Sequence, residues 1–297
     1  PPLPLTLQSA WTRLKASPLG YRLAKGAFWS LAGTVVSRSL SLAASIFVAR
    51  WLGKETFGEL AILQSTIGMF GVFAGFGMGM TATKHVAELR QSDPARAGRL
   101  IGLSGWVAWL AGGLITLALM LAAGPIAATV LGAPHLAPYL RLCAPLLLLG
   151  SLNGAQVGAL TGFEAFKRVA QLNALGGAVS FVLLAAGAWC LDLEGAAYAL
   201  VIGSIFTWFI NGLALQREAS RARVPIRYRL HLSEAKVLWE FSLPSLISGI
   251  LVWPVNWACA AILVNQPGGY GEMGLFNVAN QWRGFVMLVP NTLVGIS

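Results

Sequence analysis

The chain has 297 residues, of which 56% are hydrophobic and only 11% are charged, and its net charge is +10. A soluble globular protein carries about 25% charged residues, and its interior is too small to bury this much apolar surface. The composition therefore excludes an ordinary soluble domain and predicts an all-α membrane protein that lies in a lipid bilayer.

The apolar stretches follow one another with short connections. A helix needs about 20 apolar residues to cross the hydrocarbon core. The sequence has eight such candidates, so we predict about eight transmembrane helices, here called spans 1 to 8: Gly26–Ala49, Phe57–Met80, Ile101–Gly124, Pro138–Leu160, Gln171–Leu191, Gly195–Leu215, Trp239–Val264 and Met273–Ser297. The chain does not begin with Met and stops inside an apolar run, so we expect it to be a fragment.

The basic residues predict how the spans are oriented. Residues 1–25 and the connections after spans 2, 4 and 6 carry 16 of the 21 Lys and Arg residues, whereas the other side has only Arg50, Lys54 and Arg141. Positively charged connections stay in the cytoplasm. We therefore expect residues 1–25 to be a cytoplasmic lead-in and the protein to be a multi-pass protein of the cell membrane. Because most of the basic residues lie in these few connections, we expect no nucleic-acid binding.

An internal repeat divides the chain. A shift of 216 residues places spans 1 and 2 on spans 7 and 8, and four glycine pairs then coincide: Gly33 with Gly249, Gly53 with Gly269, Gly58 with Gly274, and Gly79 with Gly295. Parallel repeats of this kind are common in transporters. We predict a first six-helix lobe at 26–215, a basic inter-lobe connection at 216–238, and the first two helices of a second lobe at 239–297.

Four segments in the first third of the chain carry a family resemblance: Lys25–Ser30 (KGAFWS), Val48–Gly58 (VARWLGKETFG), Gly75–Gly79 (GFGMG) and Lys84–Arg90 (KHVAELR). Together they resemble the N-terminal signature of the polysaccharide-transporter, or oligosaccharide flippase, family. That family belongs to the superfamily of multidrug, oligosaccharidyl-lipid and polysaccharide exporters. The rest of the chain is similar to the family in span count and loop pattern.

The resemblance implies a fold of 12 to 14 helices in two lobes around a cavity. It also implies a flippase that moves undecaprenyl-pyrophosphate-linked sugar repeat units, such as those of O-antigen, from the cytoplasmic to the outer leaflet. A functional association with polysaccharide polymerase or export machinery is a further expectation. Family members of this kind use cationic residues on spans 1, 2 and 8. This sequence has Arg38 on span 1 and Arg283 on span 8, but Gln64 at mid-depth of span 2.

The two arginines are themselves unusual. Both lie about ten residues inside a span, where an arginine costs about 2.5–3.5 kcal/mol and usually faces a cavity or a partner. No Asp or Glu lies at the same depth. Paired hydrogen bonds from Arg suit an anion such as a pyrophosphate, although each side chain could instead extend to an interface or bind carbonyls of a neighbouring helix.

Neutral polar residues at a similar depth complete the predicted substrate-binding set, namely Gln64, Asn256, Asn280 and Gln281. We expect their amides to hydrogen-bond sugar hydroxyls. Small polar residues also join helices in lipid, so a packing role stays open for each of them.

Two other functions compete with a flippase that works by alternating access. A multidrug antiporter of the same fold commonly needs a membrane-embedded carboxylate in its first lobe, and the first six spans offer none. A membrane sugar polymerase or ligase tends to have a large outer loop with catalytic residues, whereas the longest outward connection here, Pro125–Ala137, contains His135 alone. The sequence has no nucleophile–base pair, metal-ligand cluster or phosphate loop, so we expect no enzymatic activity, cofactor or metal.

Overall fold

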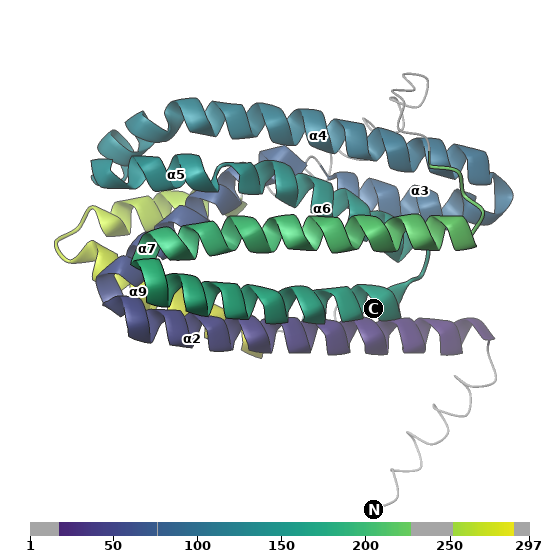
Figure 1. Ribbon diagram of the computed structural model, residues 1–297, viewed down its shortest axis with the longest axis horizontal. Coiled ribbons are helices and arrows are strands. Elements are labelled where there is room, and N and C mark those ends of the chain that lie inside the picture. Colours follow the sequence, from purple (N-terminus) through teal and green to yellow (C-terminus); the bar gives the residue numbers. More distant parts are fainter. Residues whose placement is uncertain (1–17, 76, 227–251, 288–297) are drawn as a thin grey trace, which may run out of the picture.

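The computed structural model describes residues 18–75, 77–226 and 252–287, and all the regular structure in these ranges is helical. The helices run side by side along the long axis of the molecule (Figure 1). Their bounds are α2 Pro18–Gly75, α3 Met78–Ser92, α4 Pro94–Pro125, η1 Ile126–Val130, η2 Pro134–Leu136, α5 Ala137–Cys143, α6 Pro145–Gly162, α7 Phe166–Arg221, an unlabelled helix Val252–Val264, and α9 Gly269–Val286. Four stretches are long and apolar enough to cross a membrane: Phe28–Gly75, Pro94–Val130, Pro134–Gly162 and Phe166–Arg221.

The two longest helices, α2 and α7, each fold back on themselves at a kink. A straight helix of 58 residues would measure about 87 Å, far more than the roughly 30 Å of the hydrocarbon core. In α2 the kink is at Gly53, where φ is 74°, a value that glycine adopts without steric cost. In α7 it lies at Leu191 and Asp192, and Asp192 has φ 47°. Each helix therefore supplies two of the predicted spans.

Two predicted spans are interrupted in the structure. Predicted span 2 was continuous from Phe57 to Met80, but α2 ends at Gly75 and α3 begins after Gly77, which adopts a left-handed φ of 65°. Predicted span 4 is divided between α5 and α6 at Pro145, whose ring removes a backbone donor. Apolar residues continue through both breaks, so hydropathy alone could not locate them.

The last two predicted spans are described in part. Only Val252–Val264 of span 7 lies within the described residues, and 239–251 lie outside them. Helix α9 begins at Gly269, four residues before the predicted start of span 8, and residues 288–297 of that span lie outside the description.

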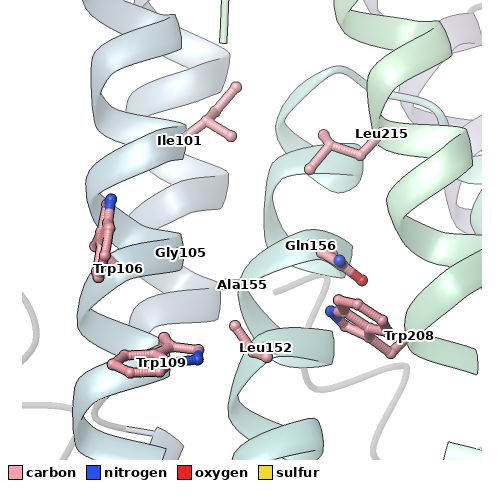
Figure 2. Close-up of a pocket in the computed structure, with 9 residues that line it drawn as sticks. All are labelled: Ile101, Gly105, Trp106, Trp109, Leu152, Ala155, Gln156, Trp208 and Leu215. Atoms are coloured by element: carbon pink, nitrogen blue, oxygen red, sulfur yellow. The ribbon is translucent and has the colours of Figure 1, made fainter. Parts of the chain in front are cut away.

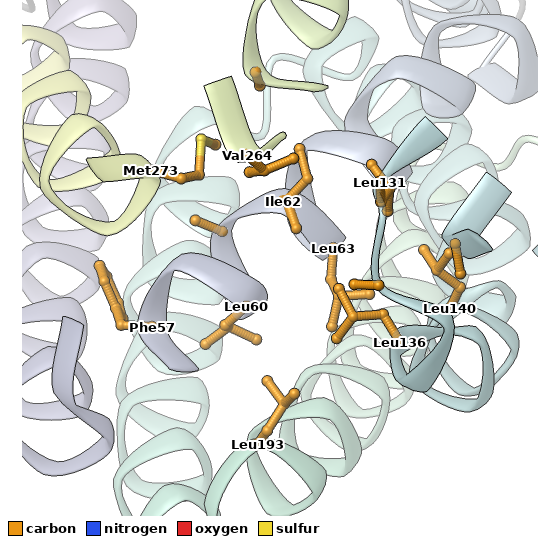
Figure 3. Close-up of a cluster of buried hydrophobic side chains, with 14 of the residues drawn as sticks. Phe57, Leu60, Ile62, Leu63, Leu131, Leu136, Leu140, Leu193, Val264 and Met273 are labelled. Carbon is orange, nitrogen blue, oxygen red and sulfur yellow. The ribbon is translucent and has the colours of Figure 1, made fainter. Parts of the chain in front are cut away.

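The largest buried cluster lies at one end of the bundle, where both kinks and the turn before α9 are found; we call this the kink end. Figure 3 shows its side chains meeting from several helices. Phe57 and Leu63 come from α2, Leu193 from α7, and Val264 and Met273 from the last two helices, and all five are at most 6% exposed. At this end, apolar packing joins the last two helices to the first six spans.

A reciprocal glycine contact holds α2 against α9 within this end. A Cβ atom on Gly58 would lie 1.8 Å from the Tyr270 carbonyl oxygen, and one on Gly274 would lie 2.5 Å from the Lys54 carbonyl oxygen. Both distances are far shorter than a real Cβ contact, so only glycine fits at either position. The shift of 216 residues relates Gly58 to Gly274 and also Lys54 to Tyr270, so the two halves of the contact are equivalent in the repeat.

Candidate functional site

A pocket of about 240 Å³ lies between the first half of α2 and α9, and we call it the arginine pocket. It brings Arg38 together with Asn280 and Gln281, three of the six residues predicted to bind substrate. Ser41, Leu42, Gly284 and Phe285 complete its lining. None of these residues is acidic, so the guanidinium group of Arg38 is the only charge among them.

Arg38 is anchored across the pocket by the backbone of α9. Its Nη1 donates a hydrogen bond to the carbonyl oxygen of Gly284. A Cβ atom on residue 284 would lie 3.2 Å from that nitrogen, so glycine leaves the room that the guanidinium needs. The other guanidinium N–H groups make no hydrogen bond to the described residues and remain available to an anion.

The structure separates the other three predicted residues from this pocket. Successive helix residues are rotated by about 100°, so Arg283 lies off the face that carries Asn280, Gln281 and Gly284, and its side chain is exposed. Gln64 is exposed on the second half of α2. Asn256 is exposed on the helix Val252–Val264 and donates to its own backbone at Val252, at 2.8 Å. The roles of all six residues stay predictions.

The contact between α2 and the helix Val252–Val264 has no charge at the corresponding level. The indole nitrogen of Trp257 donates to Thr66 Oγ1 at 3.0 Å. A Cβ atom on Gly68 would lie 3.1 Å from the Trp253 ring. Gly68 and Gly284 are related by the same shift of 216 residues. This fifth glycine pair was not predicted to be important, and the repeat register is the signal that would have found it.

Polar contacts close the kink end around the turn before α9. Asn265 donates to the Val130 carbonyl at 2.7 Å, and the Tyr270 hydroxyl donates to the Leu131 carbonyl at 2.8 Å. On the same side His135 and Glu59 lie 2.8 Å apart. The contacts of Asn265 and Tyr270 connect the last two helices to the segment that follows α4, and the His135–Glu59 contact connects that segment to α2.

A larger pocket, of about 340 Å³, has a different character. Figure 2 shows it between α4, α6 and α7, with Trp106 and Trp109 on one side and Trp208 on the other. Its one polar side chain is Gln156, whose amide, oriented to satisfy both contacts, donates to the Trp208 carbonyl at 3.1 Å and accepts from the Trp208 indole at 3.3 Å. A pocket lined by these residues has no charge to bind a pyrophosphate. Its three tryptophans are all at least 36% exposed, as suits a surface that faces lipid.

Comparison with known proteins decides the family. The family model described as "Polysaccharide biosynthesis protein" matches residues 23–296, nearly the whole chain. The chain belongs to this family. Among curated members, it is 27% identical over 272 residues to the EPS I polysaccharide export inner membrane protein EpsE of Ralstonia nicotianae, covering 89% of this chain and 59% of that protein. It is also 27% identical over 161 residues to the lipid III flippase of Escherichia coli K12, covering 54% of this chain and 36% of the flippase.

Solved structures show the same fold for this family member. An outward-facing multidrug resistance MATE transporter of the MOP superfamily superposes with a TM-score of 0.73 at 19% identity, over 91% of this chain and 61% of the transporter. A MOP superfamily transporter from Pyrococcus furiosus gives 0.71 at 18% identity, over 90% and 60%. The chain is thus part of a multi-pass α-helical membrane protein, and it spans about 60% of the length of these relatives.

Proposed function

We propose that this chain is the first part of a flippase that carries an undecaprenyl-pyrophosphate-linked oligosaccharide, such as an O-antigen repeat unit, across the cytoplasmic membrane. One observation carries the proposal. Arg38 lies in a pocket between the first and last described spans, together with two amides and no carboxylate. The relatives named for polysaccharide export and lipid III flipping support the same class of substrate.

The chemistry of the arginine pocket suits this substrate. A pyrophosphate that enters a low-dielectric region loses its hydration, and a charged group is costly there unless it is paired. A guanidinium offers planar, paired N–H donors that match phosphate oxygens. The amides of Asn280 and Gln281 can then bind sugar hydroxyls, while the polyprenyl chain remains in the bilayer.

The kink end is the outer end in this proposal, and the N-terminus is cytoplasmic, as the basic connections predict. The contacts of Gly58 with Tyr270 and of Asn265 with Val130 then close the cavity toward the outside. Alternating access requires these contacts to separate while the substrate is still bound in the arginine pocket. The contacts then re-form after the substrate is released.

A multidrug antiporter is the second candidate, because MATE transporters share the fold. Such a pump binds cationic drugs and needs a carboxylate near its binding site. The arginine pocket offers the opposite charge. Drug efflux from cells that express the intact protein separates the two candidates, since a flippase gives no resistance and a pump restores no glycan.

Glycan export in a flippase-deficient strain tests the proposal. We expect Arg38→Ala to abolish surface display of the glycan at normal membrane abundance, and Arg283→Ala, whose side chain lies off the arginine pocket, to have a smaller effect. A charge-assisted hydrogen bond contributes about 1.5–3 kcal/mol, which corresponds to a loss of roughly 10- to 150-fold per bond. Lys replacements should restore part of the export, because the charge survives although the paired geometry is lost.

Arg50→Ala is the matched control. Arg50 is also exposed on the first half of α2, but it lies near the kink at Gly53 and does not line the arginine pocket. This variant should export normally. Full export by Arg38→Ala at normal abundance would show that Arg38 is structural.

A further inference from the structure

A second polar cavity lies behind the arginine pocket, inside the first six spans. It is formed by the first half of α2 and by both halves of α7, and its volume is about 240 Å³. Five polar side chains line it: Ser37, Ser41, Asn173, Ser180 and Thr207. We call it the hydroxyl pocket. None of its lining residues is charged.

Most of the polar side chains of this pocket have no hydrogen-bond partner among the described residues. Serine and threonine in membrane helices usually donate to a backbone carbonyl one turn earlier, as Thr34 and Thr66 do. Among the described residues, the side chains of Ser37, Ser41, Asn173 and Ser180 make no hydrogen bond. Because a polar group without a partner is costly within a membrane, four such groups around one cavity indicate a polar occupant.

Glycines keep the walls of the pocket open beside its hydroxyls. A Cβ atom on Gly176 would lie 3.3 Å from Thr207 Oγ1, and one on Gly203 would lie 3.1 Å from Ser180 Oγ. Both distances are tighter than ordinary contact. The Thr207 hydroxyl donates to the Gly203 carbonyl at 2.8 Å, which leaves its oxygen free to accept.

Size and charge narrow the class of ligand. Pockets for drug-sized ligands measure about 300–1,000 Å³, so this one holds a fragment. At about 30 Å³ per water molecule, its volume corresponds to roughly eight waters. A neutral group with several donors and acceptors fits this space better than a phosphate, for which the lining offers no cation.

The hydroxyl pocket and the arginine pocket meet at span 1. Ser41 lines both of them, and Arg38 and Ser37 are adjacent in the chain. We propose that the hydroxyl pocket binds one sugar residue of the lipid-linked substrate, the residue joined to the pyrophosphate that Arg38 holds. This inference rests on the proposed function and adds a saccharide-specificity site, with Asn173 and Ser180 as its determinants.

Binding to the purified intact protein tests the inference. The probes are undecaprenyl pyrophosphate without sugar and the same lipid with a single hexose, N-acetylhexosamine or 6-deoxyhexose. We expect at least one sugar-bearing lipid to bind wild type about five- to tenfold tighter than the bare lipid, because each neutral hydrogen bond contributes about 0.5–1.5 kcal/mol. Asn173→Leu keeps the side-chain size and removes the amide, so it should bring that ratio close to one.

Ala178→Leu is the control, since Ala178 is an exposed residue of the same helix that does not line the pocket; it should keep the ratio. Ser180→Ala is a smaller change and should also lower the ratio of the two affinities. It serves as the test if Asn173→Leu does not fold. The inference is wrong if wild type binds the bare and the sugar-bearing lipids equally, or if the folded pocket variants keep the wild-type ratio. Failure of wild type to bind any of these lipids would instead refute the proposed function.

Discussion

Replacing Gly58 with Ala adds one methyl group at the tightest contact between α2 and α9. That methyl would lie 1.8 Å from the Tyr270 carbonyl oxygen, so the first turn of α9 must move away by more than an ångström. Overpacking of this kind costs about 1–3 kcal/mol. Alanine also gains up to about 1 kcal/mol of helix propensity over glycine. The net effect we expect is a loss of about 1–2 kcal/mol of stability for Gly58→Ala.

The equivalent change at Gly274 should act on the same contact. Its added methyl would meet the Lys54 carbonyl oxygen at 2.5 Å, which again forces the two helices apart. Once one methyl has separated the helices, the second has less to displace. The double variant should therefore lose less stability than the sum of the two single variants, as expected for residues in direct contact.

Thermal unfolding of the intact protein in detergent measures these effects. Gly150→Ala is the matched control, because Gly150 lies on α6 and a Cβ atom there would meet nothing within 4 Å. The control should unfold at or above the wild-type temperature, while both contact variants unfold below it. If Gly58→Ala and Gly150→Ala behaved alike, the close approach of α2 and α9 would not exist in the folded protein.

Two further predictions concern the ends of the bundle. Single cysteines placed at Ser92 and Ser220, in a protein whose three native cysteines are replaced, should resist an impermeant reagent added outside intact cells and react after permeabilisation; labelling in intact cells would reverse the proposed orientation. Tyr270→Phe removes the hydroxyl that donates to the Leu131 carbonyl and should lower the stability of the intact protein by about 1 kcal/mol. An unchanged unfolding temperature would mean that this hydrogen bond contributes nothing to the closed kink end.

Composition and periodicity predicted the helical membrane fold because a lipid-facing helix leaves a long apolar run in the sequence. The kink at Gly53 could also be predicted. That glycine begins a polar turn between spans 1 and 2, and the repeat pairs it with Gly269. The interruptions at Gly77 and Pro145 were missed, because the neighbouring residues are as apolar as those of an unbroken span. Only the backbone conformation reveals them.

The candidate site shows a similar limit. Depth along span 1 made Arg38 a candidate, because the spacing of residues along a helix follows directly from the sequence. Depth alone also grouped Arg283 with it, but the direction of a side chain around the helix axis depends on which neighbour the helix contacts. Arg38 donates a hydrogen bond to the Gly284 carbonyl. This contact depends on the positions of spans 1 and 8 and on the rotation of each helix about its axis, which the sequence does not give.

The repeat relates two contacts, and charge lies at one of them. Gly284 on α9 receives Arg38, and its repeat partner Gly68 on α2 receives the ring of Trp253. Both glycines admit a large side chain from the facing helix, from neighbouring repeat positions, since the shift relates Arg38 to Pro254 and Trp253 to Ser37. A single charged contact binds one anionic group and leaves the opposite contact apolar. The proposed substrate, with one pyrophosphate and a neutral saccharide, matches this arrangement.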